Sequence, residues 1–565
     1  MRSIRRLSGL TFFLLSGCNE PLSAPIPTAH PELDAPVRGG VLHLATTFDL
    51  KSLDPATSAS ALDAELLEMI YAGLVDFDAS GKIFADLSEN YSISGDARTY
   101  AFRLRRGVLM HDGEELTASD VKRSIERALH PETPSPFASF YDRIEGFQDY
   151  TEKKSEHLAG VRSTGRYDVE IRLREPDATF LAALAMPSLR PVCKSAGERF
   201  DDAWSPCGAG PFKLAPGGWQ PSRSVSLVRH EGYFRTNEPY LDGVVYTLGM
   251  NAVTQRFKLE AGEIDVFREL TQLDTTRFSA DPKWREFGFR ETARNLLGEG
   301  MNVEMPPFDN VEVRRAVAAA IDRDELRRLR GTNLVIQTRV LPGVLGRDPG
   351  FVGQRFDRAA ALEHMRLAGW PFDPATGTGG WPTPITYVVT QSGLSEFTAQ
   401  VIQQQLAKIG LRIELKLVSF PTYLALTQRR HSVAISNQGW NQDFPDPADF
   451  FEPLFSTSAI NEESSNNTSF YSNDRLDALL ARGRRAADPR ERQRLYDDAD
   501  RIVVDDAPWA LTLSYPLYVV HQPYLRRYRD HAVYGNFIGG TWLDRGATAV
   551  AKRAGVLGSV LGGLR

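Results

Sequence analysis

The chain has 565 residues, and because a single hydrophobic core stops growing at roughly 250–300 residues, two or three globular units are expected. Its apolar content of 42% and charged content of 24% are typical of a globular protein. The net charge is −6 and no long run of one sign occurs, so the concentrated basic face that nucleic-acid binding requires is not indicated.

The first 17 residues differ from the rest of the chain. A basic head over residues 2–6 is followed by an apolar run over residues 10–15. This order is typical of a secretory signal, since a membrane span needs about 20 apolar residues. The run Leu15-Ser16-Gly17-Cys18 resembles the bacterial lipobox, in which the cysteine is acylated and becomes the new N-terminus.

We therefore predict a lipoprotein signal peptide over residues 1–17 and a lipid on Cys18. Acyl chains would anchor the protein stably to a membrane, outside the cytoplasm, in the periplasm or cell envelope. A plain secretion signal with an incidental cysteine is the alternative.

Three cysteines occur in the chain, at Cys18, Cys193 and Cys207. With Cys18 acylated, Cys193 and Cys207 remain as an even pair in an oxidising compartment, which predicts a disulfide. A zinc site is a poorer explanation, because two cysteines without a nearby histidine pair leave ligands missing. Two free thiols are the remaining alternative.

Residues 18–37 are rich in proline and small residues, which predicts an extended tether, and the globular part begins near Arg38. A helix is predicted over residues 66–75 from its apolar face. Alternation of apolar and polar residues predicts strands at 41–45, 100–104, 169–173, 225–229 and 244–248.

A tight turn is predicted at residues 111–113, because Gly113 permits a positive φ. A helix then follows over residues 117–129. Thr117 can cap this helix, and Asp120 three residues later comes close to a capping box.

The second half of the chain predicts a strand–helix–strand unit, with strands at 385–390 and 411–417 around a helix at 398–409 that Gly410 ends. Such a unit indicates a parallel α/β sheet. Asn310 caps a further predicted helix, and residues 476–504 are predicted to be helical with a break at Asp488-Pro489.

No enzyme motif is present in the sequence. It lacks a GxxxxGK[ST] loop, a GxGxxG turn, an HExxH pair and a GxSxG elbow, and no pair of carboxylates is spaced for catalysis. His111 beside Asp112 could suggest a base with its orienting carboxylate, but a polar turn explains both residues better. We therefore expect no catalysis, no cofactor and no metal.

A set of short motifs occurs in a fixed order between about residue 38 and residue 530. They are Ser52-Leu53-Asp54-Pro55, the run Ile70 to Val75, the stretch Tyr100 to Val121, Gly208-Ala209-Gly210-Pro211-Phe212, Val313-Arg314-Arg315-Ala316, Ala320-Ile321-Asp322-Arg323, and the stretch Gly439-Trp440 to Asp446-Pro447. Each is weak alone. The ordered set resembles the family 5 solute-binding proteins, the dipeptide/oligopeptide/nickel group of ABC-importer receptors, with Ala209 in the usual threonine place of the GTGPF turn.

The resemblance implies an α/β, periplasmic-binding-protein-like fold with two lobes that close on a ligand by hinge motion, and an extra small domain on the N-terminal lobe. We expect the N-terminal lobe at 38–75, 207–298 and 508–545, the extra domain at 76–206 and the second lobe at 299–507. The tail 546–565 has no assigned role. The implied partners are a peptide or other small solute, and an ABC permease with its ATPase; a monomer is expected.

In peptide-binding relatives, a segment after Gly-Trp carries an aspartate that pairs with the ligand α-ammonium, and Asp443 fits this place. A carboxylate suits a desolvated ammonium, which needs a charged partner. Trp440 could pack on a ligand or belong to the core. Gln438 and Gly439 could offer backbone groups to an extended peptide, and Asn441 belongs to the same segment. The alternative for Asp443 is a loop aspartate that caps local backbone.

The chain departs from the dipeptide receptors of this family, which carry an arginine for the ligand carboxylate before a helix. Val389, Thr390 or Gln391 stands there, and none is basic. Longer peptides therefore fit better than dipeptides, unless Arg339 or Arg347 substitutes. A receptor for a nickel chelate, sugar or opine on the same fold, a secreted hydrolase and a lipoprotein without a transporter remain the alternatives.

Overall fold

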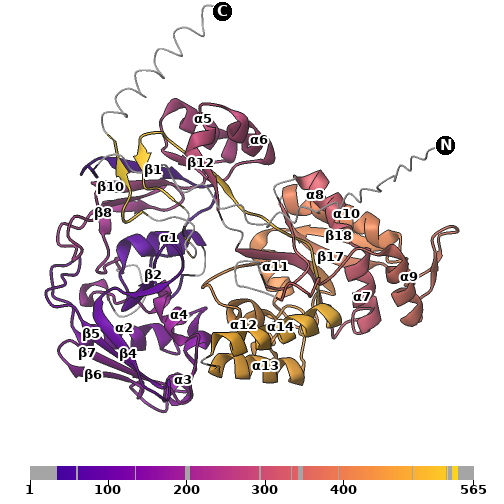
Figure 1. Ribbon diagram of the computed structural model, residues 1–565, viewed down its shortest axis with the longest axis horizontal. Coiled ribbons are helices and arrows are strands. Elements are labelled where there is room, and N and C mark those ends of the chain that lie inside the picture. The colour runs from indigo at the N-terminus through magenta and orange to yellow at the C-terminus, as the bar shows by residue number, and fades with distance from the viewer. Residues whose placement is uncertain are drawn as a thin grey trace, which may run out of the picture.

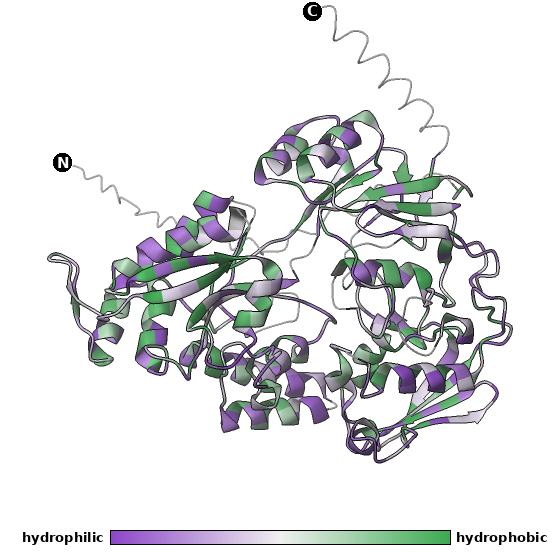
Figure 2. Ribbon diagram, turned by 180° about the vertical axis from the view of Figure 1, so that it is seen from behind, coloured by the Kyte–Doolittle hydropathy of each residue, from purple (hydrophilic) through white to green (hydrophobic). Residues whose placement is uncertain are grey.

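The computed structural model describes residues 35–58, 61–133, 135–197, 204–291, 294–331, 334–341, 348–391, 393–486, 488–529, 531, 533 and 538–544. Figure 1 shows two groups of elements side by side, one coloured indigo to magenta with the yellow C-terminal strands, the other rose through orange to gold. Hydrophobic residues concentrate on the strands, and the helices alternate hydrophilic and hydrophobic stretches (Figure 2). The predicted signal 1–17, Cys18 and the tail 546–565 lie outside the described residues.

The first group contains a four-stranded sheet in the order β1-β10-β9-β8. Its strands are β1 (Val41–Ala45), β10 (Gly243–Thr247), β9 (Ser224–Arg229) and β8 (Phe212–Gln220). β1 pairs parallel with β10, and the other two pairings are antiparallel. The strands predicted by alternation around 41–45, 225–229 and 244–248 are all present, within one residue.

The first helix ends earlier than the sequence predicts. Helix α1 runs over Ala61–Ile70, and Val75 already belongs to the strand β2 (Val75–Phe77), which pairs with β3 (Ile83–Ala85). The Ile70 carbonyl accepts a hydrogen bond from the Gly210 amide at 3.0 Å. A Cβ on Gly210 would lie 2.4 Å from the Ile70 carbonyl carbon, so only glycine lets this turn pack on the helix end.

A second four-stranded sheet is antiparallel, in the order β4-β5-β7-β6. Its strands are β4 (Ser88–Ile93), β5 (Thr99–Leu104), β7 (Asp168–Arg172) and β6 (Val161–Gly165). Helix α2 (Ala118–Leu129) begins as predicted, and the Asp120 carboxylate accepts hydrogen bonds from the Thr117 amide and hydroxyl at 3.0 and 2.6 Å. One continuous apolar cluster joins this sheet to the first.

The second group is built on a five-stranded sheet in the order β18-β17-β19-β13-β20. Its strands are β18 (Ile413–Val418), β17 (Ile385–Thr390), β19 (Ile435–Asn441), β13 (Asn295–Met301) and β20 (Trp509–Leu511). β17 pairs parallel with both β18 and β19, whereas β13 is antiparallel to its neighbours. The predicted strand–helix–strand unit is therefore confirmed, with α10 (Gly393–Ala407) between β17 and β18.

Helices cover both faces of this sheet, each over its own apolar cluster. One face carries α7 (Val311–Ala320), α8 (Arg323–Arg330), α9 (Arg358–Leu367) and α10. The other face carries α12 (Ala448–Phe455), α13 (Asp474–Arg485) and α14 (Pro489–Asp506). The break predicted at Asp488-Pro489 separates α13 from α14, with Asp488 as the cap of α14.

Two adjacent stretches of chain join the groups. The chain passes from β12 (Gly288–Arg290) to β13, and returns from β21 (Leu513–Ser514) to β22 (Tyr518–His521). The Glu291 amide donates to the Leu517 carbonyl at 2.8 Å, and the Asn295 side chain donates to the Tyr515 carbonyl at 2.9 Å. A pair of crossing stretches is an arrangement around which two lobes can rotate.

The remaining elements complete the two groups. They are α3 (Phe147–Thr151), α4 (Phe180–Ala185), α5 (Ala252–Ala261), α6 (Gln272–Ala280), α11 (Phe420–Thr427), β11 (Val266–Phe267), β14 (Val335–Ile336), β15 (Phe372–Asp373), β16 (Thr378–Gly379), β23 (Leu525–Arg526) and β24 (Trp542–Leu543). Within the described ranges, no helix has the length and apolar character needed to cross a bilayer.

Candidate ligand-binding site

One edge of β19 is open beyond its first residues. β19 pairs with β13 along its whole length, but with β17 only at Ile435 and Ser436. The Asn437 side chain then accepts a hydrogen bond from the Thr390 amide at 3.2 Å, and the two strands separate. Residues 438–441 have no strand partner on this edge in the described part of the chain. An extended ligand can add to such an edge by main-chain hydrogen bonds.

Four of the five predicted ligand residues lie on this edge. Gly439 and Asn441 are exposed, whereas Gln438 and Trp440 are partly buried. The Gln438 side-chain amide donates to the Ser436 hydroxyl at 2.7 Å, so its side chain is engaged within its own strand. This edge therefore exposes mainly backbone groups, and the binding of a ligand by Gln438 and Gly439 stays a prediction.

Trp440 packs against the apolar cluster beneath α12, α13 and α14. Its indole Nε1 lies 3.4 Å from Oδ2 of Asp449 and donates to it. A buried indole usually finds such a polar partner. These contacts favour the core interpretation of Trp440 over stacking on a ligand.

The loop after β19 places Asp443 against the segment 76–206. Phe444, the next residue, is buried in the apolar cluster of the first group and meets the Phe140 ring edge-on at a centroid distance of 5.4 Å. Tyr141 follows Phe140, and the Asp443 charge contributes to raising the pKa of the Tyr141 phenol, after burial as the larger cause. Asp443 therefore lies where the two groups meet.

The Asp443 carboxylate accepts no hydrogen bond from any described residue and forms no ion pair with one. Burial raises its pKa to about 7. Its backbone amide donates to Oδ2 of Asp449 at 3.0 Å. Burial, followed by the charge of Asp443, also raises the pKa of Asp449 well above its ordinary value, and Oδ1 of Asp449 is buried without a hydrogen-bond partner among the described residues.

The third aspartate of this loop has a different environment. Asp446 receives two hydrogen bonds from the Arg492 guanidinium, one of them at 2.6 Å, and one from the Ala448 amide at 2.8 Å. Asp446 and Asp449 thus hold the loop, as expected of structural residues. The local capping role that was the alternative for Asp443 is filled by these two neighbours.

The other end of the site has no basic residue on β17. This strand ends at Thr390, between Val389 and Gln391. Arg339 is buried and binds Asp500 at 2.6 Å and Asp497 at 3.1 Å, so it belongs to the interior rather than to a ligand site. Arg347 lies outside the described residues.

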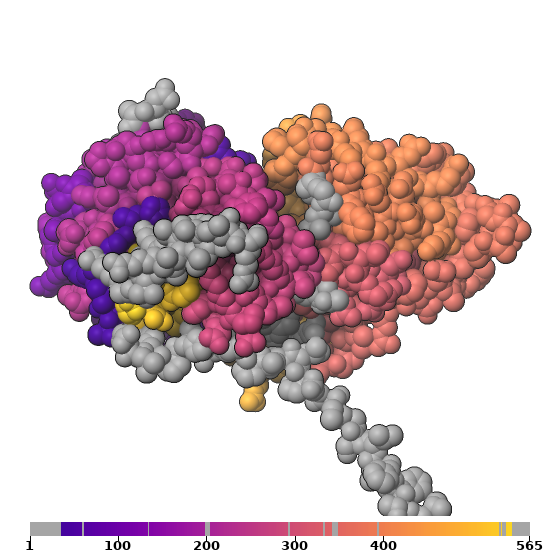
Figure 3. Space-filling view, turned by 90° about the horizontal axis from the view of Figure 1, so that it is seen from above, coloured from indigo at the N-terminus to yellow at the C-terminus, as the bar shows by residue number. Residues whose placement is uncertain are grey.

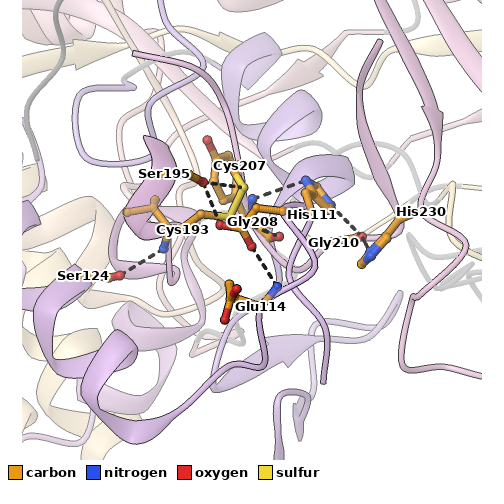
Figure 4. The surroundings of a disulfide bond; sticks show 12 residues. His111, Glu114, Ser124, Cys193, Ser195, Cys207, Gly208, Gly210 and His230 are labelled. Carbon is orange, nitrogen blue, oxygen red and sulfur yellow. Dashed lines mark hydrogen bonds between the residues drawn. A yellow bond between two sulfur atoms is a disulfide. The ribbon is translucent and has the colours of Figure 1, made fainter. Parts of the chain in front are cut away.

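The predicted disulfide is present, with Cys193 and Cys207 joined at a Cα–Cα distance of 5.4 Å (Figure 4). Asp112 lies close to both sulfur atoms, but a disulfide offers no thiolate to a metal ion.

His111 and His230 lie beside the disulfide, and both rings bind the Gly210 carbonyl, at 3.1 and 3.2 Å. Burial lowers the pKa of both imidazoles, that of His111 to about 4. Gly113 has a φ of 89°, so the turn interpretation of the His111 segment is supported.

Two cavities lie away from the Asp443 loop. One of about 310 Å³ is lined by Arg38 and residues of the stretch 229–238, and one of about 510 Å³ lies against β17, β18 and Pro306. Figure 3 shows a groove where the magenta and orange surfaces meet. The Asp443 site is therefore identified by its charge and its open strand edge, and not by an enclosed cavity.

Comparisons with known proteins place the chain in a family. The model described as "Bacterial extracellular solute-binding proteins, family 5 Middle" matches residues 82–462. The glutathione-binding protein GsiB of Salmonella choleraesuis (strain SC-B67) is 26% identical over 473 residues, which cover 82% of this chain and 87% of that protein.

Solved structures agree with this result. The periplasmic binding protein DppA from Helicobacter pylori, in complex with the peptide STSA, superposes with a TM-score of 0.78 at 26% identity, covering 90% of this chain and 99% of that one. The oligopeptide-binding protein AppA from Bacillus subtilis, at 21% identity, shares the fold with a TM-score of 0.75, covering 90% of this chain and all of that one. The predicted two-lobe α/β binding-protein fold is confirmed. The chain belongs to the bacterial extracellular solute-binding proteins of family 5.

Proposed function

We propose that this solute-binding protein captures short peptides by their free α-ammonium and delivers them to an ABC permease. The observation that carries this proposal is the carboxylate pair of Asp443 and Asp449, which has no cationic partner among the described residues, beside the open edge of β19. Asp449 is buried and Asp443 is half-buried. Two neighbouring carboxylates without a counter-charge favour a cation, because a bound ammonium supplies the missing charge and hydrogen bonds.

The names of the relatives support a peptide-like ligand. The relative from Salmonella is named for glutathione, and the Helicobacter structure holds the peptide STSA. Both are binding proteins, which agrees with the expectation that this chain is not an enzyme. Because β17 ends without an arginine, we propose peptides of three to five residues, whose carboxyl end is not fixed at one basic side chain.

The test of the proposal is calorimetric titration with free and N-acetylated tri- to pentapeptides. Free peptides are expected to bind and acetylated ones to bind far more weakly. Equal affinity for both would show that the site does not recognise the free amine, and it would favour a chelate, a sugar or another non-peptide solute as the ligand.

Peptide binding is expected to weaken in acid. Burial raises the pKa of ligand-free Asp443 to about 7, whereas a bound ammonium would lower this pKa. The complex then holds fewer protons than the free protein, so affinity rises with pH up to about 7, and below that falls by at most about tenfold per pH unit. The α-ammonium itself stays charged up to a pH of about 8.

Titration of one free tripeptide from about pH 5 to about pH 8 measures this dependence. Asp443→Asn is the control, because it cannot ionise and its residual binding should hardly change over this range. A wild-type affinity that stays constant below neutral pH would contradict an ionised Asp443 at the amine.

Membrane attachment through Cys18 also belongs to the proposal, since residues 1–34 lie outside the described part of the chain. Replacing Cys18 with serine is expected to move the protein from the membrane fraction to the soluble fraction, because the acyl chains supply the apolar surface that holds it. Fractionation with immunoblotting checks this. A Cys18→Ser chain that stays with the membrane would show that the lipobox interpretation is wrong.

We keep the division of the chain as part of this proposal. The N-terminal lobe (38–75, 207–298 and 508–545) and the extra domain (76–206) share one apolar cluster, and the second lobe (299–507) is built around two others. These two clusters also contain Leu296, Trp509, Leu511 and Leu513, which the division assigns to the N-terminal lobe. The proposed working unit is a monomer that presents its loaded, closed form to the permease and ATPase.

A further inference from the structure

A further contact joins the second lobe to the extra domain. The last turn of α13 carries Arg484 and Arg485, and it lies beside the turn that leads into α4 (Figure 1). Nη2 of Arg484 lies 3.0 Å from Oδ2 of Asp177, and Nη2 of Arg485 lies 2.6 Å from Oε2 of Glu175. Each pair joins residues of different parts of the chain.

The Arg484–Asp177 pair is buried. The Asp177 side chain is 0% exposed and that of Arg484 is 11% exposed. Among the described residues, the Asp177 carboxylate accepts hydrogen bonds from the Thr179 amide and hydroxyl, and its one ion pair is with Arg484. A buried carboxylate that loses its cation is strongly disfavoured, so this contact holds the two parts together.

A backbone hydrogen bond supports the same contact. The Ala178 amide donates to the Arg484 carbonyl at 2.6 Å. The last carbonyls of a helix have no partner inside the helix, so the extra domain satisfies one of them at the end of α13. Arg484 also lies 3.4 Å from Glu452 on α12, which ties the pair to the helix that follows the Asp443 loop.

Arg484 and Asp443 therefore act on the same face of the extra domain. The stretch Ala138–Tyr141 meets the Asp443 loop through the Phe140–Phe444 ring contact, and the Tyr141 hydroxyl donates to the Ala183 carbonyl of α4 at 2.7 Å. The Asp177 turn begins the same helix, α4. A clamp at Asp177 thus fixes the wall that Phe140 and Tyr141 form beside Asp443.

We propose that Arg484 and Asp177 form a latch that clamps the extra domain onto the second lobe, closes the amine end of the binding site and slows ligand release. This inference uses the proposed site at Asp443 for its effect on the ligand, but the latch itself is a contact between two parts of the protein. Arg484 is a positioning residue, because it reaches the ligand only through the wall that it holds.

The latch is tested without ligand by single-molecule FRET. Dyes on cysteines introduced at Ser163 in β6 and Arg475 in α13, in the Cys18→Ser chain, report the distance between the extra domain and the second lobe. Arg484→Gln is expected to raise the opening rate by about tenfold or more, because it leaves Asp177 without its cation. Arg482→Gln, which removes the same charge from an exposed position of the same turn, should leave the rate unchanged.

Asp177→Asn tests the pair from the other side, in case Arg484→Gln disturbs Glu452. Asparagine keeps an acceptor for Thr179, so the extra domain should fold. Arg484 also lies 4.0 Å from Asp142 of the extra domain and 3.4 Å from Glu452, so Arg484→Gln removes these contacts as well. Asp177→Asn should therefore raise the opening rate by a large part of the Arg484→Gln effect, and the double variant should raise it no further than Arg484→Gln alone, because both changes break the Arg484–Asp177 pair. Arg485→Gln should have a smaller effect, since the Arg485–Glu175 pair is more exposed.

Opening rates of Arg484→Gln and Asp177→Asn that equal those of Arg482→Gln would overturn the latch, whatever the ligand is. If the latch variants open faster but free and acetylated peptides bind all chains equally, the latch stands and the proposed peptide function fails. Dissociation of a bound free tripeptide should accelerate in the same two variants by the same factor as opening.

Discussion

Asp443→Asn is expected to weaken binding of a free tripeptide by roughly 10²- to 10³-fold. The change keeps the shape of the side chain and removes its charge, which leaves the ligand ammonium buried without a partner. Breaking a buried ion pair from one side typically costs about 3–5 kcal/mol, and about 1.4 kcal/mol corresponds to a factor of ten in affinity. N-acetylation of the peptide removes the other partner and should weaken binding to a similar extent.

A double cycle of protein and ligand separates this role from a structural one. The Asp443→Asn protein with the N-acetylated peptide should lose much less binding free energy than the sum of the two single losses, because each single change breaks the same interaction. Calorimetric titration measures all four affinities. Additive losses would mean that Asp443 acts elsewhere, for example by holding its own loop.

The stability of the ligand-free protein gives an independent control. The folded-state pKa of Asp443, about 7, lies above the ordinary aspartate value, so ionising this side chain opposes folding as pH rises toward 7. An asparagine side chain at this position cannot ionise. The Asp443→Asn protein is therefore expected to unfold at a higher denaturant concentration than wild type at pH above 7, although it binds peptide poorly. If Asp443 instead held its loop in place, the Asp443→Asn protein would unfold at a lower denaturant concentration than wild type.

Removing the disulfide is expected to lower the free energy of unfolding by about 3 kcal/mol, on the chain-entropy estimate for a short closed loop. Cys193 and Cys207 are 14 residues apart, and both are buried. Alanine at both positions avoids placing a new polar group in the interior. Denaturant unfolding of this variant and of oxidised wild type gives the difference.

Peptide affinity should not change in the double alanine variant, because the disulfide lies beside His111 and Gly208 rather than near the Asp443 loop. Mass mapping under non-reducing conditions identifies the linked peptides directly. Two freely alkylated thiols in the native protein, or equal stability of both chains, would contradict the disulfide.

Local signals in the sequence predicted those elements whose ends depend on neighbours in the chain. Thr117 and Asp120 set the start of α2, and Gly410 follows the turn after α10 with a φ of 85°. The end of α1 could not be predicted in this way. It depends on Gly210, far along the chain. The Gly210 amide donates to the Ile70 carbonyl, which would otherwise accept the next hydrogen bond of the helix.

The roles of the aspartates in the Asp443 loop could not be predicted from local sequence either. Asp443, Asp446 and Asp449 lie within seven residues of sequence, and only the family resemblance distinguished the first. Their roles depend on contacts that only the folded chain shows: Arg492, far along the chain on α14, binds Asp446, and the Asp443 backbone amide binds Asp449 within the loop. Phe140 and Tyr141 carry no motif, and only folding brings them to this loop.

The most direct test of the account is mass spectrometry of the solute released when the purified native protein is denatured. The account predicts peptides of three to five residues, each of which gains the mass of an amine-reactive label at its N-terminus. It also predicts that Asp443→Asn protein, purified in parallel, releases far less. A metal chelate, a sugar or a peptide with a blocked N-terminus as the main released species would contradict peptide capture through Asp443.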